Sequence, residues 1–182
     1  LVDRRPSLAK AAWDWGFGDW ETALGAASHM GNREIAEYLL LRGAHPTIFS
    51  AAMLGQLDVV KAFVAALPGI QRITGPHSIS LLSHAAAGGA DAKTVRSYLE
   101  SLGDAREAPG GSITEERMKT LLGSYVYGNG PTERIEITIA RAQLAFTRMG
   151  TTTRNLRHMG SYTFHPVGAA AVRIRFDRTD KG

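Results

Sequence analysis

The sequence predicts an α+β fold in which an N-terminal stack of helix pairs is followed by a small antiparallel β-meander or partly closed barrel. Two observations support this prediction. A short motif that ends in Gly recurs three times within the first 105 residues, and apolar residues at helical spacing follow each copy. Beyond residue 123, apolar residues recur at every second position, which is typical of half-buried strands.

The domain organisation follows from this change of period. We expect a helical repeat domain over residues 1–105, a linker over 106–112 and a small β domain with a short leading helix over 113–182. The linker is placed there because Pro109-Gly110-Gly111 is the strongest turn signal in the chain.

The repeated motif occupies residues 22–31, 46–55 and 80–89. Small Ala residues let a first helix lie close to its partner, and Gly allows the tight turn into a second helix. Apolar pairs four residues apart predict these second helices. Each copy has an aliphatic residue at its third position, Ala at its sixth and Gly at its tenth: Leu24, Ala27 and Gly31; Ile48, Ala51 and Gly55; Leu82, Ala85 and Gly89.

This pattern resembles the ankyrin repeat, whose consensus combines Thr-Pro-Leu-His-x-Ala with a Gly and a Val/Leu helix. The resemblance covers about residues 10–105. The intervals from Thr22 to Pro46 and from Pro46 to Ser80 are 24 and 34 residues, against about 33 in the family. We therefore expect the first interval to lack the protruding β-hairpin of the family, and the second to have room for it.

The segment before the first copy is expected to be a helix. Residues 7–16 are interpreted as a degenerate first repeat or cap, because end units of repeat arrays are usually atypical. Trp13, Trp15 and Trp20 are expected to pack in the core or the cap, since large aromatic side chains are commonly buried; contact with a ligand is the alternative.

Alternating apolar residues predict the strands of the C-terminal part. Residues 113–122 read as a short helix with Ser112 or Thr114 as its N-cap. An antiparallel meander of five or six strands is then expected. The alternating residues are Ile135, Ile137 and Ile139; Leu144 and Phe146; Tyr162 and Phe164; and Val172, Ile174 and Phe176.

Three segments of this part resemble a known accessory domain. They are similar to the small lipocalin-like β domain at the C-terminus of some penicillin-binding-protein-like serine hydrolases. The three segments are residues 122–128, Leu144-Ala145-Phe146 and the closing strand 171–176. The resemblance implies a barrel-like accessory domain and a bacterial origin, and it carries over no catalytic residue.

Composition and charge restrict the class of protein. The 182 residues are 44% hydrophobic and 21% charged, as in an ordinary folded domain, and there is no apolar run long enough to cross a membrane. The chain has no Cys, which excludes disulfides and thiolate chemistry. Absence of Cys and of an initiator Met is compatible with a processed periplasmic or secreted protein, but the compartment stays open, as does the question of a longer parent protein.

The net charge of +4 lies in the C-terminal part. From Ile113 onward there are eleven Lys and Arg against six Asp and Glu, whereas the preceding residues have ten against eleven. Arg148, Arg173 and Arg175 are candidates for a basic surface that would bind a phosphate- or carboxylate-bearing partner. A solvated face with salt bridges is the preferred interpretation.

The motifs of common catalytic sites are missing. The sequence has no phosphate-binding loop and no nucleophile elbow. The six histidines are scattered, and His158 and His165 have no carboxylate close in sequence that would complete a metal site. We therefore expect a non-enzymatic protein with no cofactor and no metal.

The first helix of each pair would line the inner surface of an ankyrin stack. The family register places His29, Met30, Met53, Leu54 and His84 there, and Met suits an adaptable protein-binding patch. Packing of these side chains against a neighbouring repeat or the β domain is the slightly preferred interpretation.

The sequence thus predicts a protein–protein interaction module with an unidentified protein partner. The alternative is a small-molecule or lipid-binding protein that uses the β domain or the inter-domain cleft. Nucleic-acid binding is not expected, because the strands lack the interleaved aromatic and basic residues of RNA-binding sheets.

Overall fold

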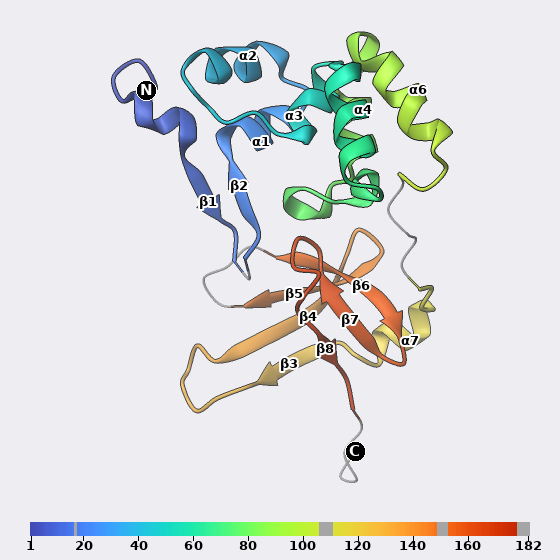
Figure 1. Ribbon diagram of the computed structural model, residues 1–182. Coiled ribbons are helices and arrows are strands. Elements are labelled where there is room, and N and C mark those ends of the chain that lie inside the picture. The colour runs from blue at the N-terminus through green and yellow to red at the C-terminus, as the bar shows by residue number, and fades with distance from the viewer. Residues whose placement is uncertain (17, 106–110, 149–152, 178–182) are drawn as a thin grey trace. The chain divides into compact units, whose positions relative to one another are not determined.

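The computed structural model describes residues 1–16, 18–105, 111–148 and 153–177, and it has the predicted α+β fold (Figure 1). An ankyrin-like helical region is followed by a β domain. The chain divides into one unit of Leu1–Asp14 and Asp19–Ala108 and another of Trp15–Gly18 and Pro109–Gly182. Residues 106–110 of the predicted linker, with Pro109 and Gly110, lie outside the described residues, so the linker boundaries stay a prediction.

Three helix pairs form the described part of the helical unit, and each pair begins at a copy of the repeated motif. The side chains of Thr22, Thr47 and Ser80 accept hydrogen bonds from the backbone N–H three residues ahead, which fixes where each first helix starts. The helices are α1 (Ala23–His29), α2 (Arg33–Leu41), α3 (Ile48–Met53), α4 (Leu57–Ala66), α5 (Leu81–Ala87) and α6 (Lys93–Ser101).

Two apolar clusters hold the pairs together. One lies around α1 and α2 and includes Leu24, Leu39 and Met53. The other lies around α3 to α6 and includes Val60 and Leu99. Fully buried Ala residues in both clusters allow the helices to approach one another closely; they are Ala36, Ala52 and Ala85.

The segment before α1 is a hairpin, so the helix predicted over 7–16 is wrong. A 3-10 turn, η1 (Pro6–Lys10), leads into β1 (Ala12–Asp14), which pairs antiparallel with β2 (Trp20–Thr22). Gly16 and Gly18 have φ values of +102° and +79° in the connection. Two such glycines oppose a helix, while aromatic residues favour strands.

The tryptophans of this hairpin contradict the expectation of burial. Trp13 lies opposite Glu21 and Trp20 opposite Asp14, and the two indoles are 67% and 61% exposed. Trp15 is 37% exposed. A two-stranded ribbon has too few neighbours to cover both faces, so large side chains on it remain accessible.

The two intervals between helix pairs differ, as their lengths predict. No strand lies between α2 and α3. Between α4 and α6 the chain forms the 3-10 turns η2 (Ile70–Arg72), η3 (Pro76–Ser78) and η4 (Gly89–Ala92). An isolated bridge joins Thr74 to Ser80 and closes the loop that carries η3.

The β unit is a six-stranded antiparallel meander that curls into a half-barrel, in agreement with the predicted meander (Figure 1). The short helix α7 (Glu115–Lys119) precedes it, and Thr114 is its N-cap. Met118 and Leu121 pack with Phe146 and Phe164 in its core. The strands are β3 (Gly123–Val126), β4 (Arg134–Ala140), β5 (Gln143–Arg148), β6 (Arg154–Gly160), β7 (Thr163–Pro166) and β8 (Ile174–Arg175).

No helix in the part of the chain that the structure describes has both the length and the apolar character to pass through a bilayer.

Glycines in the turns within the first and second helix pairs lie against the backbone of the third pair. A Cβ atom at Gly31 would lie 2.3 Å from the carbonyl oxygen of Ala87, and one at Gly55 would lie 2.2 Å from that of Asp91. Both residues also have positive φ. Spacing between the helix pairs therefore depends on glycine at these positions.

We predict that Gly55→Ala destabilises the helical unit more than Gly103→Ala. The φ values are almost equal, +76° and +79°, but a Cβ at Gly103 meets no atom within 4 Å. Both variants carry the cost of an unfavourable backbone, about 1 kcal/mol; Gly55→Ala adds a backbone clash of about 1–3 kcal/mol. Urea unfolding followed by circular dichroism measures the difference, and equal losses would contradict the close approach.

Candidate functional site

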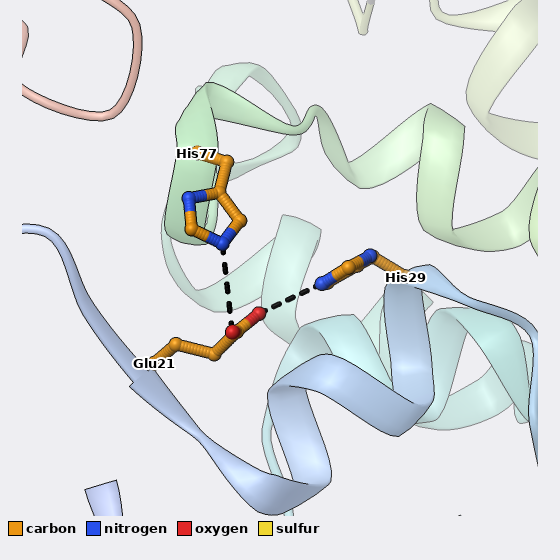
Figure 2. Close-up of side chains that lie close together, drawn as sticks. All are labelled: Glu21, His29 and His77. Carbon is orange, nitrogen blue, oxygen red and sulfur yellow. Dashed lines mark hydrogen bonds and ion pairs between the residues drawn. The ribbon is translucent and has the colours of Figure 1, made fainter. Parts of the chain in front are cut away.

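A cluster of one carboxylate and two imidazoles joins three elements of the helical unit (Figure 2). Glu21 comes from β2, His29 from the last residue of α1, and His77 from η3. The Glu21 Oε1 atom lies 2.7 Å from His29 Nε2, and Glu21 Oε2 lies 3.5 Å from His77 Nε2. The two rings are edge to face with centroids 5.9 Å apart.

Asp19 fixes the orientation of His77. Its carboxylate accepts a hydrogen bond from the His77 backbone N–H at 2.8 Å and lies 2.9 Å from His77 Nδ1. His77 has a φ of +58°, a conformation that is uncommon for a residue with a side chain. The two contacts to Asp19 stabilise that conformation, and they leave Nε2 directed at Glu21.

Burial makes these carboxylates unusual. Asp19 is 3% exposed and Glu21 is 8% exposed, whereas Asp and Glu are almost never so buried unless they are paired. In this cluster Glu21 is paired with His29 and His77, and Asp19 is paired with His77.

A buried Ser–His pair lies beside the cluster. The His84 ring is 6.2 Å from the His29 ring, and His84 Nδ1 lies 3.0 Å from Ser28 Oγ. Because the Ser28 hydroxyl donates to the carbonyl oxygen of Phe49 at 3.0 Å, it accepts from the protonated Nδ1 of His84. Burial, with a smaller contribution from His29, lowers the pKa of His84 to about 4, so the ring is neutral.

This Ser–His pair is not arranged as a nucleophile and its base. Ser28 and His84 are fully buried, and the serine proton points to a backbone carbonyl. Among the described residues His84 Nε2 has no hydrogen-bond partner. The pair instead links α1 to α5 across the first and third helix pairs.

The residues predicted for the protein-binding patch fall into three groups. Met30 is 73% exposed. His29 and Leu54 are half-buried, and His29 belongs to the polar cluster. Met53 and His84 are in the interior, which corrects the expectation that they are available on an inner surface. Three pairs are enough to enclose these two side chains, because α3 and α5 pack directly on each other.

The basic residues predicted for the β domain are exposed, but each has a contact. Arg175 Nε forms an ion pair with Asp177 Oδ2 at 2.9 Å. Arg173 donates to the carbonyl oxygens of Ala170 and Val172. Arg148 lies over the ring of Tyr127, at 5.5 Å from its centroid. Their role as a binding surface stays a prediction.

Sequence reasoning missed Asp19, Glu21 and His77 as a group. His77 is 58 positions from Asp19, so only the fold brings them together. Asp19 comes directly before β2 and Glu21 is the middle residue of that strand. No element was assigned to this short segment from the sequence, so the pair of carboxylates gave no usable signal.

Comparison with known proteins gives one match. Residues 19–50 match the family model of the ankyrin repeat, a span that contains β2, α1 and α2. No curated protein and no solved structure matches the chain. The ankyrin repeat indicates a protein–protein interaction module, and Glu21 and His29 lie within the matched residues.

We predict that Ser28→Ala lowers the free energy of unfolding by about 1–3 kcal/mol, because the His84 N–H and the Phe49 carbonyl oxygen lose a buried partner. The control is Ser101→Ala. Ser101 also donates to a backbone carbonyl but is exposed, so its loss is expected to stay within about 0.5 kcal/mol. Urea unfolding measures both, and equal effects would show that the buried pair adds no stability.

Proposed function

We propose that the ankyrin-like region recognises a protein partner through the β1–β2 hairpin, with Trp13 and Trp20 as its anchors. The observation that carries the proposal is the exposure of Trp13 and Trp20, 67% and 61%, one on each face of a single hairpin. Trp is the residue type most enriched among side chains that dominate binding energy. A repeat stack with an exposed hairpin is suited to an extended partner surface.

We infer that exposed residues elsewhere in the helical unit extend the recognition surface. Met30 follows His29 at the end of α1 and is 73% exposed, and a flexible Met adapts to different partner shapes. Half-buried Leu54 and His29 can border it. The β domain would serve as a second docking element through its exposed arginines.

We predict that Trp13→Ser combined with Trp20→Ser abolishes partner capture. The immobilised full chain is exposed to lysate of the source organism, captured proteins are identified, and the affinity of the purified partner is measured by calorimetry. Loss of two anchors at about 2 kcal/mol or more each would weaken binding at least about 100-fold. The control is Leu41→Ser, because Leu41 is 85% exposed but lies in α2.

The outcomes are distinct. A partner that the double variant still binds at full affinity would exclude the hairpin as the recognition surface. If no protein is retained and a small molecule co-purifies with the chain, that outcome would support the alternative, a small-molecule-binding protein, over protein recognition.

We further predict that Met30→Glu lowers the affinity for the same partner by about tenfold or more, since a charge in a desolvated interface costs at least about 1.4 kcal/mol. Glu at an exposed helix end leaves stability within about 0.5 kcal/mol, which thermal unfolding checks. Unchanged affinity would confine the interface to the hairpin.

A further inference from the structure

We propose that Glu21, His29 and His77 bind a divalent transition metal ion of the zinc class. One carboxylate oxygen and one nitrogen of each ring all lie within 4.8 Å of one another. Bond lengths of about 2.0–2.2 Å around tetrahedral zinc place neighbouring ligand atoms roughly 3.3 Å apart. Glu21 Oε1 lies 2.7 Å from His29 Nε2 and Glu21 Oε2 lies 3.5 Å from His77 Nε2, so the two distances, each from a different oxygen, fall on either side of that value.

Asp19 has the place of a supporting carboxylate. Histidines that bind metals almost always donate a hydrogen bond from their other ring nitrogen to a carboxylate or carbonyl. This bond fixes the ring orientation and its tautomer. Asp19 Oδ2 lies 2.9 Å from His77 Nδ1, and the second oxygen accepts the His77 backbone N–H. His77 Nε2 is therefore presented as a ligand before an ion arrives.

Charge favours a dication at this position. Asp19 and Glu21 are both nearly buried and lie close to the same imidazole, that of His77. A divalent ion held by Glu21 and the two imidazoles would be attracted by both carboxylates. Glu21 would exchange its hydrogen bond to His29 for a bond to the metal, with only a small change of position.

The chemical types of the three ligand atoms indicate which metal ions the site would bind. Two imidazole nitrogens with one carboxylate suit zinc and its neighbours, whereas Mg²⁺ and Ca²⁺ prefer all-oxygen sites. Three protein ligands leave a fourth position for water or for a group from a partner. The side chain of His77 is 31% exposed, so water can reach this imidazole.

An ion at this site would tie together parts of the chain that are far apart in sequence. Its ligands come from β2, α1 and η3, which span residues 21–77. Metal binding would then contribute directly to the folding free energy of the helical unit.

The test begins with the unaltered full chain, so that it does not depend on a variant folding. Zn²⁺ is titrated into the metal-free protein by calorimetry and by NMR of the histidine ring signals. We expect saturable binding of one Zn²⁺ per chain, with shifts of the His29 and His77 rings and none of the His45 ring, and a rise in melting temperature. No saturable binding, or saturation that leaves the His29 and His77 signals in place, overturns the proposal, as does tighter binding of Mg²⁺.

Variants then assign the ligands. Asp19→Asn is expected to weaken Zn²⁺ about 10–100-fold, as removal of a supporting carboxylate does elsewhere. His77→Ala is expected to weaken it more, and to abolish the rise in melting temperature. The matched control is His45→Ala, because His45 is an exposed histidine of the same unit. An equal effect of His45→Ala and His77→Ala would mean that the ion binds surface histidines without a defined site.

Discussion

Close approach of backbone at the turns within the helix pairs is the constraint on which the helical unit depends. Gly31 lies against the Ala87 carbonyl, Gly55 against that of Asp91, and an added Cβ at Gly88 would lie 2.0 Å from the Met53 carbonyl oxygen. No other residue type allows this spacing with a relaxed backbone. Gly31 follows His29 by two positions, and Ala87 follows His84 by three. The contact between Gly31 and Ala87 therefore also brings the imidazoles of His29 and His84 together. It places Ser28 within hydrogen-bond distance of α5.

The sequence was most informative where local chemistry decides structure. Thr22, Thr47 and Ser80 cap helices at the predicted starts, and alternating residues such as Ile135 and Ile137 predicted strands because one face of the sheet is buried. Strand β6 was not foreseen, since Arg154 to Gly160 has no clear alternation and only its pairing with β5 and β7 makes it a strand. Two turns were also hidden, one between β4 and β5 and one between β6 and β7, because Arg141-Ala142 and Ser161-Tyr162 adopt positive φ without the Asn-Gly signature of two-residue hairpins.

The candidate site was the least predictable part, for a reason of geometry. Its residues are drawn from a hairpin, a helix end and a loop, and their spacing follows no period. Reasoning from repeat register placed His84 and Met53 on an inner surface, but a stack of three pairs buries both. Consensus register states which helix face looks inward; it does not state how deeply the neighbouring repeat covers that face. The tryptophans were mispredicted in the opposite direction. Their residue type favoured burial, but the two-stranded ribbon leaves them exposed.

The two proposals share one strand, and that has a thermodynamic consequence. Trp20 and Glu21 are adjacent on β2, and Trp13 lies directly opposite Glu21 in the hairpin. An ion that holds Glu21 against α1 and η3 would restrict the strand that presents the proposed anchors, so part of the ordering cost of partner binding would be met before the partner arrives. Linkage is reciprocal: if the ion raises affinity for the partner by some factor, the partner raises affinity for the ion by the same factor. Partner binding at the recognition surface and ion binding at the polar cluster would then be thermodynamically coupled through β2.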